Sequence, residues 1–288
     1  MSQTKILILG ATGMLGSAAY RLYAQSPAIH VVGTVRGSST PASFVQHPTA
    51  EIAGGVDISD FDRVTRVFGA VRPDVVLNCI GVVKQLDAAK DPLVSIAINA
   101  LLPHRLAELC AASGVRLVHV STDCVFSGNI GRYKETDTSD AYDLYGRTKY
   151  LGEVDYPHAV TLRTSIIGHE IDSNVSLVDW FLSQRGPTVK GYRRAIYTGL
   201  PTVELARIVR DIVVPRRDLR GVWHVASAPI NKFELLQLIA RQYGKAIEIL
   251  PDDAVAIDRS MDGTRFRTET GYVAAAWPQL VAQMHAAR

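Results

Sequence analysis

An apolar segment that runs directly into a glycine-rich turn constrains the fold of this chain most strongly. Residues 5–10 read KILILG, and Gly13 and Gly16 follow where a helical pattern begins over residues 14–25. Glycine permits a tight turn and a close approach of the backbone to a ligand, and a helix start supplies amide donors and a positive dipole. A strand, a glycine loop and a helix in this order predict a site for the phosphates of a dinucleotide. A loop in which the glycines only form a turn is the alternative.

The rest of the first half alternates short apolar segments with helical patterns. Strands without polar alternation are typical of a parallel sheet that is covered on both faces. Because such strands alternate with helices, the crossovers are expected to be right-handed and the fold to be an α/β doubly wound parallel (Rossmann) sheet. The strands are expected at 5–10, 30–35, 74–81, 116–122 and 159–168, and the helices at 14–25, 61–71, 103–114 and around Tyr145.

After residue 168 the alternation loosens. The patterns predict helices at 175–184, 202–214 and 231–244, the last with Asn231 as N-cap, and a strand at 221–227. The segment 251–271 is charged and poorly periodic. We therefore expect residues 1–168 to form a dinucleotide-binding Rossmann domain and residues 169–288 to form mainly a smaller C-terminal substrate-binding lobe. Segments within 195–228 are expected to return to the first domain.

Composition excludes several classes of protein. The net charge is +3 without a dense basic block, so no nucleic-acid partner is expected. Three cysteines are too few for a disulfide framework and favour a reducing compartment. The start lacks the features of a signal peptide and no apolar run is long enough to span a membrane, so a soluble cytoplasmic protein is expected. The eight histidines show no paired spacing, and no metal site is predicted.

The choice of cofactor depends on the end of the second strand. NAD-binding chains carry an acid about 20 residues after the glycine loop, where this chain has Arg36. A guanidinium can bind a 2′-phosphate through two hydrogen bonds, so NADPH is predicted, with NADH as the alternative. A solvated arginine on a loop is the other interpretation of Arg36. Asp57 follows a short expected strand and either contacts the adenine amino group or remains a surface acid.

Tyr145 and Lys149 stand four residues apart in the segment YGRTKYLGE. On a helix they share one face. A lysine ammonium beside a phenol favours the phenolate, so the pKa of Tyr145 is expected to be lowered and the residue to donate a proton near neutral pH. In a chain with 11 tyrosines such a pair arises easily by chance, so the pair alone is weak evidence.

Several motifs occur in one order along the chain: the glycine loop, NCIG at 78–81, STD at 121–123, and Tyr145 with Lys149. This order resembles that of the extended short-chain dehydrogenase/reductase family over nearly the whole sequence. Within that family the chain is most similar to the dTDP-4-dehydrorhamnose reductases and related nucleotide-sugar reductases. The closer resemblance rests on STDCVFSG, YKETD, YGRTKYLGE, LRTS and GLPT.

The resemblance implies an oxidoreductase that uses NADPH to reduce the keto group of a 4-keto-6-deoxy nucleotide sugar in deoxysugar biosynthesis. Tyr145 would protonate the keto oxygen, and Thr122 would hydrogen-bond the same oxygen. Lys149 would tune Tyr145 and bind the nicotinamide ribose, supported through water by Asn99, while Asp123 would lie in the substrate pocket. The remaining cofactor-binding residues implied are Gly10, Thr12, Gly13, Met14, Leu15, Gly16, Ile58, Asn78, Cys79, Ile80 and Gly81.

Substrate contacts are expected at Val83, Cys124, Phe126 and Arg259. Arg259 occupies the place of a late arginine motif in the reductases but lacks the proline that usually follows it, and a solvated surface role is the alternative. An arginine facing a diphosphate is chemically reasonable. Arg193 and Arg194 are further basic candidates.

Cys124 stands where GDP-fucose synthases carry a catalytic cysteine, which they use with a histidine. The matching region, NVSLVDW at 174–180, has no histidine. An inert pocket cysteine is therefore preferred, and an epimerase/reductase that uses Cys124 as a base is one alternative. Asp-Cys after Thr122, in place of Asp-Glu, argues against dehydration. Another alternative is a non-catalytic NADP-binding regulatory subunit, as one relative in the family is. Magnesium dependence and homodimerisation are left open.

Overall fold

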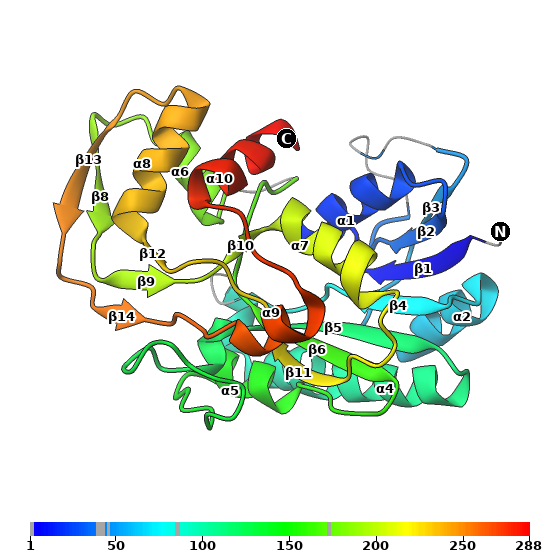
Figure 1. Cartoon of the computed structure of the whole chain (residues 1–288). Coiled ribbons are helices and arrows are strands. Elements are labelled where there is room, and N and C mark those ends of the chain that lie inside the picture. Colours follow the sequence, from blue (N-terminus) through cyan, green and yellow to red (C-terminus); the bar gives the residue numbers. More distant parts are fainter. Residues whose placement is uncertain (1–2, 39–43, 45–46, 84–86, 172–173) are drawn as a thin grey trace.

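A parallel sheet of seven strands forms the centre of the computed structural model, which describes residues 3–38, 44, 47–83, 87–171 and 174–288 (Figure 1). The strand order is β11-β6-β5-β4-β1-β2-β3, so the order reverses between β1 and β4, as in a doubly wound dinucleotide-binding sheet. The strands are β1 (Thr4–Leu9), β2 (Ile29–Thr34), β3 (Ala50–Ala53), β4 (Val75–Asn78), β5 (Arg116–Thr122), β6 (Ala159–Thr164) and β11 (Gly221–His224). The predicted α/β fold is confirmed.

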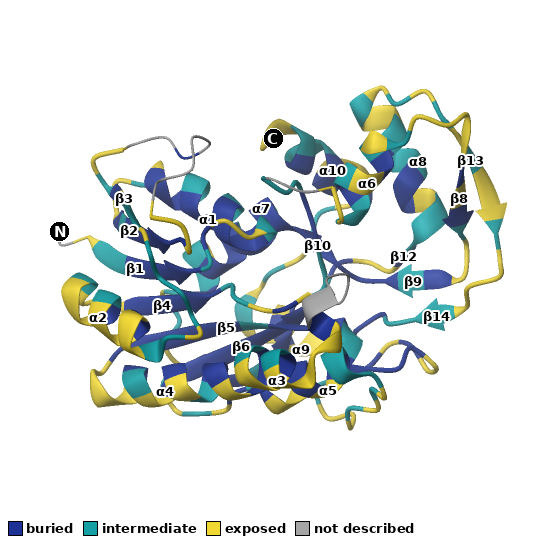
Figure 2. Cartoon of the chain, turned by 180° about the vertical axis from the view of Figure 1, so that it is seen from behind, coloured by how far each residue is buried: buried dark blue, intermediate teal, exposed yellow. Residues whose placement is uncertain are grey.

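Both faces of this sheet are covered by helices, which explains its apolar strands. Successive side chains of a strand point to opposite faces. Ile6 and Ile8 of β1 pack in the core that contains α1 (Met14–Ala24) and α7 (Thr202–Ile208), and Leu7 and Leu9 pack on the other side, against α2 (Phe61–Val71) and α4 (Leu102–Ala112). All four side chains are completely buried. Figure 2 shows the same pattern, with buried strands inside and exposed residues on the outer sides of the helices.

The helix that leads into β5 contains a change of helix type. α3 (Pro92–Ser95) passes into the π-helical turn η2 (Ile96–Leu101) and then into α4. Pro103 has no N–H to donate to the carbonyl four residues earlier, that of Asn99, and proline in a helix interior disturbs the regular bonding pattern. π-Helical turns are often found at functional sites, and this one contains Asn99.

A smaller lobe is built from short strands and helices. Three small sheets have the strand orders β12-β9-β14, β13-β8 and β10-β7. Their strands are β7 (Ile166–Ile167), β8 (Thr188–Tyr192), β9 (Ala195–Tyr197), β10 (Leu200–Pro201), β12 (Ile230–Asn231), β13 (Glu248–Asp252) and β14 (Ile257–Asp258).

The remaining helices of the whole described chain are η1 (Asp87–Lys90), η3 (Asp123–Val125), α5 (Leu144–Leu151), α6 (Leu177–Ser183), η4 (Val209–Val213), α8 (Lys232–Tyr243), α9 (Thr264–Thr270) and α10 (Trp277–Ala286).

Differences from the sequence-based boundaries have local causes. The strand expected at 159–168 divides into β6 and β7, and β7 pairs with β10 outside the main sheet. The segment 251–271, which has no clear period, includes β14 and α9. Asn231 caps α8 as expected, since its side chain accepts a hydrogen bond from the Glu234 amide at 2.8 Å. Within 195–228, β11 lies beside β6 in the main sheet, whereas β9 and β10 belong to small sheets. The division into two domains at residue 168 stays a prediction.

One helix among the described residues, Pro92–Ala112, is long and apolar enough to cross a membrane. About half of its most apolar stretch, 44%, is buried inside the protein. The core helix of a soluble protein has the same length and composition, so this helix is weak evidence for a membrane span.

Candidate active site

The glycine loop packs so closely that side chains would not fit. Gly10 has a φ of +81°, and a Cβ there would lie 2.8 Å from Cγ1 of Ile80. A Cβ on Gly16 would lie 2.1 Å from the carbonyl oxygen of Gly10. These approaches bring the first turn of α1 against the end of β1 and the loop after β4. Gly13 is the N-cap of α1 and no side chain caps that helix, so its first amides are available to an anion. Thr12 and Gly13 are exposed at the loop tip, Met14 is half-buried, and Leu15 is buried beneath them.

Side-chain amides hold the loop that follows β4. Oδ1 of Asn78 accepts a hydrogen bond from the Ile80 amide at 3.1 Å. Asn99 binds Val82 twice: its Oδ1 accepts from the Val82 amide at 2.9 Å, and its Nδ2 donates to the Val82 carbonyl at 3.1 Å. A Cβ on Gly81 would lie 3.4 Å from Oδ1 of Asn99 and 4.0 Å from Nζ of Lys149. The loop predicted to border the cofactor is therefore brought next to the predicted lysine.

Cys79 is a half-buried residue of the same loop. Burial raises the pKa of its thiol to about 12. A thiol with so high a pKa is a poor nucleophile at neutral pH, so only the backbone of Cys79 is suited to a role beside a cofactor.

Tight packing of α5 against the loop after β5 positions Tyr145. The Asp143 side chain caps α5 by accepting a hydrogen bond from the Gly146 amide at 2.8 Å. A Cβ on Gly146 would lie 2.3 Å from the carbonyl oxygen of Cys124. Only glycine allows this approach, which explains the Tyr-Gly pair in the sequence and places the half-buried Tyr145 ring next to Thr122.

Burial determines the acidity of Tyr145. It raises the pKa of the phenol well above the usual value, and a hydrogen bond with Thr122 opposes this rise. The expectation that Lys149 lowers the pKa of Tyr145 is wrong for this structure. The Lys149 ammonium instead donates to the Val120 carbonyl at 2.8 Å, so desolvation of the phenol dominates. Tyr145 is therefore a protonated phenol at neutral pH.

Lys149 is buried, with 5% of its surface exposed. Burial lowers the pKa of the ammonium to about 8, and the nearby Glu153 carboxylate opposes the shift. Glu153 is held in turn by Arg163 at 2.5 Å and accepts a hydrogen bond from the Ser121 hydroxyl at 2.7 Å. At neutral pH the lysine keeps a positive charge beneath the site, and it loses that charge as the pH rises above about 8.

Thr122 and Asp123 end β5 at the centre of the site. Thr122 Oγ1 accepts a hydrogen bond from the Cys124 amide at 3.2 Å and donates to Oδ1 of Asp123 at 3.2 Å. Both residues are buried. Burial raises the pKa of Asp123, while the positive charges of Arg259 and Lys232 oppose the rise. The half-buried Cys124 follows on the same turn.

The predicted substrate contacts differ in how they are placed. Arg259 reaches the site region, where its Nε donates to the carbonyl oxygen of Phe126 at 2.9 Å. The Phe126 side chain is completely buried and stacks on Tyr133, with ring centroids 4.1 Å apart. The Phe126 ring thus packs in the core, and its carbonyl is the group that contacts Arg259. A contact of Phe126 with substrate stays a prediction. Val83 is 44% exposed at the end of the loop after β4.

Arg36 and Asp57 lie close enough together for their charges to interact beyond the ends of β2 and β3. Arg36 is exposed and Asp57 half-buried. Hydrogen bonds from Ser59 lower the pKa of Asp57, and the charge of Arg36 acts in the same direction. Ile58, between Asp57 and Ser59, lines an apolar cavity of about 320 Å³ against the helix that begins at Pro92.

Two residues near Asp123 were missed from the sequence. Lys232 and Asp123 interact electrostatically, and the charge of Asp123 contributes to the raised pKa of Tyr197. The N-cap signal at Asn231 gives the start of α8, but nothing local in the sequence indicates that this start lies at the site.

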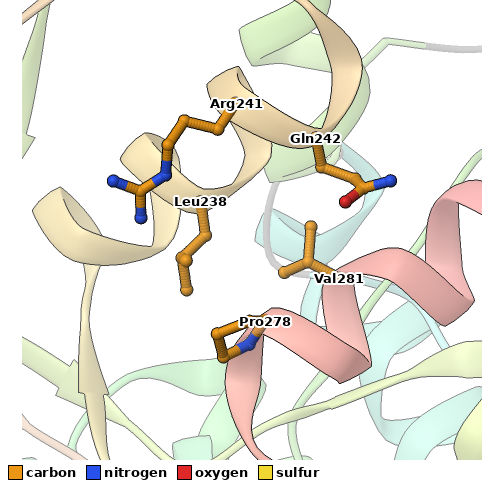
Figure 3. A pocket seen from close by; sticks show the side chains of 5 residues that line it. All are labelled: Leu238, Arg241, Gln242, Pro278 and Val281. Atoms are coloured by element: carbon orange, nitrogen blue, oxygen red, sulfur yellow. The ribbon is translucent and has the colours of Figure 1, made fainter.

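Other cavities and clusters lie apart from these residues. A cavity of about 180 Å³ lies between α8 and α10. Figure 3 shows the side chains that line it: Leu238, Arg241, Gln242, Pro278 and Val281. None of the predicted site residues lines it. Over the described ranges of the chain, no group of three His, Cys, Asp or Glu side chains is arranged to hold a metal ion.

Fold and site together define the class. A parallel sheet with this strand order, a glycine loop at the start of α1, and a Thr122–Tyr145–Lys149 group at the ends of β5 and in α5 define an extended short-chain dehydrogenase/reductase. The chain belongs to the RmlD substrate binding domain family, whose model matches residues 4–286.

Individual relatives support this assignment. The chain is 29% identical over 266 residues to "Probable low-salt glycan biosynthesis reductase Agl14" of Haloferax volcanii, a match that covers 88% of this chain and 83% of the relative. It is 34% identical over 148 residues to a dTDP-4-dehydrorhamnose reductase of Streptomyces griseus, with 51% of this chain and 43% of that protein covered. It is also 31% identical over 149 residues to methionine adenosyltransferase 2 subunit beta of Bos taurus, covering 52% and 41%. The last two matches thus span less than half of those relatives.

Among solved structures, the fold is similar to that of dTDP-4-dehydrorhamnose reductase from Bacillus anthracis in complex with NADP. The TM-score is 0.82 at 19% identity, and the match covers 99% of this chain and 100% of that chain.

Proposed function

We propose that this chain reduces the keto group of a 4-keto-6-deoxy nucleotide sugar with NADPH, as a dTDP-4-dehydrorhamnose reductase does in deoxysugar biosynthesis. The observation that carries the proposal is the gathering of Thr122, Tyr145 and Lys149 beside the loop that Asn99 holds. The reductase names of the relatives in Haloferax volcanii and Streptomyces griseus support the same chemistry.

The residues present fit a dinucleotide. The absence of side chains at Gly10 and Gly16 lets the turn pack closely against the start of α1, and the first turn of that helix is uncapped. We infer that the amides of residues 12–16 hold the pyrophosphate, that Arg36 holds the 2′-phosphate, and that Asp57 and Ile58 border the adenine. Asn78 to Gly81 and Lys149 would flank the nicotinamide and its ribose. When bound, the reduced cofactor supplies the hydride.

The protein supplies position and a proton. Thr122 and Tyr145 would both donate hydrogen bonds to the keto oxygen, which orients the carbonyl and stabilises the negative charge that develops on it. Because burial keeps Tyr145 protonated, its phenol can give a proton to that oxygen as the alcohol forms. The Lys149 ammonium, which donates to the Val120 carbonyl, would bind the nicotinamide ribose. Asn99 would keep Lys149 and the loop after β4 in register.

The test is consumption of NADPH by the purified chain with a panel of nucleotide sugars. Oxidation of NADPH is expected only when a 4-keto-6-deoxy nucleotide sugar is present, and the product should carry a hydroxyl in place of the keto group. Absence of turnover with every keto sugar of the panel, by a protein that binds NADPH, would exclude the reductase function and leave the regulatory alternative.

Replacement of Arg36 tests the cofactor. We expect Arg36→Gln to raise the KM for NADPH about tenfold or more, because a charge-assisted bidentate contact is lost, and to leave the KM for NADH nearly unchanged. Steady-state kinetics with both cofactors measure the difference. Arg66→Gln, at an exposed arginine of the neighbouring α2, is the control. An equal loss for NADPH and NADH would show that Arg36 does not contact the 2′-phosphate.

The pH dependence tests Lys149. Its pKa of about 8 lies below that of an ordinary lysine, so the ammonium is present at neutral pH and is lost as the pH rises through about 8. We expect kcat to fall in that range, whereas Tyr145, with its raised pKa, stays protonated. Because the Glu153 carboxylate raises the pKa of Lys149, Glu153→Gln should move the fall in kcat to lower pH. A profile that is the same in both proteins would contradict this assignment.

The compartment and the partners complete the proposal. We propose a cytoplasmic enzyme, which fits the thiol form of Cys79, Cys110 and Cys124. The nucleotide sugar is the expected partner, and a homodimer stays a prediction that light scattering of the purified chain can check.

A further inference from the structure

The three-stranded sheet of the smaller lobe brings three side chains to one place. Lys232 directly follows β12, Tyr197 ends β9, and Arg259 directly follows β14. Ile230 of β12 is paired with Tyr197, and the Arg259 amide donates to the Ile196 carbonyl at 3.0 Å. These strands lie together at the edge of the lobe in Figure 1. Their sheet thus places two cations and a phenol side by side, although the residues are far apart in sequence.

Contacts fix these groups in the neighbourhood of Asp123. Nζ of Lys232 lies 4.9 Å from the centre of the Tyr197 ring. Arg259 is fixed by its hydrogen bond to the Phe126 carbonyl, three residues beyond Asp123. Both cations act electrostatically on Asp123. Within the part of the chain that the structure describes, however, no carboxylate lies within the ion-pair distance of 4.0 Å from Lys232 or Arg259.

The Tyr197 hydroxyl is buried and has no hydrogen-bond partner among the described residues. Its residue is 5% exposed. Buried hydroxyl groups are nearly always hydrogen-bonded, so this one is suited to donate to a ligand. Burial and the nearby charge of Asp123 raise the pKa of the phenol, so the hydroxyl keeps its proton at neutral pH and remains a donor.

The charges in this space favour an anion. Two cations face a single carboxylate, Asp123, and burial disfavours the charged form of that carboxylate. Burial also lowers the pKa of Lys232, and an anion held beside it would oppose that shift. Lys232 is the first residue of α8, a helix of 12 residues, and the N-terminus of a helix carries the positive end of its dipole.

Two other basic residues of this lobe are already engaged. Nε of Arg193 donates to Oδ1 of Asp253 at 2.9 Å, and both residues are exposed. Lys190 forms an ion pair with Asp252 at 2.9 Å. Lys232 and Arg259, in contrast, interact electrostatically with Asp123 and have no carboxylate partner at ion-pair distance among the described residues.

We propose that Lys232, Arg259 and the Tyr197 hydroxyl bind the diphosphate of a nucleotide sugar beside Asp123. A diphosphate offers oxygen acceptors to the ammonium, the guanidinium and the phenol at once. The sugar attached to it would lie next to Thr122 and Tyr145. The inference rests on the proposed function for the identity of the ligand; Lys232 and Tyr197 are the residues it adds.

Calorimetric titration of the full chain with dTDP, UDP and GDP tests the assignment without any turnover. The proteins compared are the wild type, Lys232→Met, Lys232→Arg and Tyr197→Phe. Arg241→Met is the matched control, because Arg241 lies on the same helix but lines the separate cavity in Figure 3. Thermal unfolding is recorded for each protein, together with its affinity for NADPH.

At least one nucleoside diphosphate should bind the wild type, and Lys232→Met should weaken that binding about tenfold or more, with Lys232→Arg retaining most of it. Tyr197→Phe should weaken binding several-fold while raising the unfolding temperature, since it removes an unpartnered buried hydroxyl. If the Tyr197 hydroxyl had only a structural role, Tyr197→Phe would lower both the diphosphate affinity and the unfolding temperature. NADPH affinity should be unchanged in every variant.

The assignment is overturned if Lys232→Met binds the diphosphates as the wild type does, or if none of them binds a wild type that binds NADPH. Failure of the proposed function has a different signature. In that case no keto nucleotide sugar supports NADPH consumption, whereas the loss of diphosphate affinity in Lys232→Met would still be observed.

Discussion

Tyr145→Phe is expected to lower kcat by about 10²- to 10⁴-fold, the usual contribution of a general acid. The substitution removes one oxygen and keeps the ring that packs beside Thr122 and Cys124. Thr122 would still hydrogen-bond the keto oxygen, but no phenol would remain to protonate it. The KM for the keto sugar and for NADPH should change little, because the loss concerns the transition state and not ground-state binding. Steady-state kinetics with the keto nucleotide sugar measure the effect.

Tyr150→Phe is the matched control, since Tyr150 lies on the same helix and is 42% exposed. It should keep wild-type kcat. If Tyr145→Phe turned over at a rate close to that of Tyr150→Phe, the proton would come from another group and Tyr145 would have only a packing role.

Arg163→Met is expected to lower the free energy of unfolding by about 3–5 kcal/mol, the typical cost of leaving one member of a buried ion pair alone. Arg163 and Glu153 are only 4% and 5% exposed. Nη1 of Arg163 also lies 2.9 Å from Nε2 of His224, and its guanidinium lies 5.0 Å from the centre of the Phe126 ring. Methionine fills much of the space but leaves the Glu153 carboxylate buried without its partner. Chemical denaturation of both proteins measures the difference.

The control for this prediction is Arg207→Met. Arg207 is 39% exposed and lies 3.4 Å from Glu204, one turn away on the same helix. Partly exposed pairs of this kind contribute about 0–1 kcal/mol, so the control should unfold close to the wild type. A loss of under 1 kcal/mol in Arg163→Met would mean that the buried carboxylate finds other partners or takes up a proton.

The Rossmann fold was predictable because its elements follow from local patterns. The helix at Phe61–Val71 and the strand at Arg116–Thr122 have the boundaries expected from the sequence. Each depends on apolar spacing and flanking turn residues that a short window contains. Thr122, Tyr145 and Lys149 could be selected as a set because the order of the motifs resembles that of a family, and not because any one motif is decisive.

The features of the site that could not be predicted from the sequence depend on contacts between segments that are distant in the chain. Strands β12 and β14 have two residues each, and both are paired with β9. Strands so short leave no periodic signal, so the approach of Lys232 and Tyr197 to Asp123 was not predictable. The pKa of Tyr145 was misjudged for a similar reason. Spacing on a helix gives the neighbour Lys149, but the degree of burial and the carbonyl of Val120, which holds the ammonium, come from the tertiary fold.

The π-helical turn at Ile96–Leu101 changes which residues share a face of the helix Pro92–Ala112. A wider turn rotates everything before it relative to everything after it, so Leu93 and Leu106 cannot be projected onto one helical wheel. If this helix packs against a second helix, the residues before the turn and those after it present different faces to the partner and have to be considered separately. Removing Ala100 or Leu101 from the turn would rotate Asn99 and the segment before it by about 100° relative to α4. The Asn99 side chain would then lose its two hydrogen bonds to Val82, although both residues had been retained.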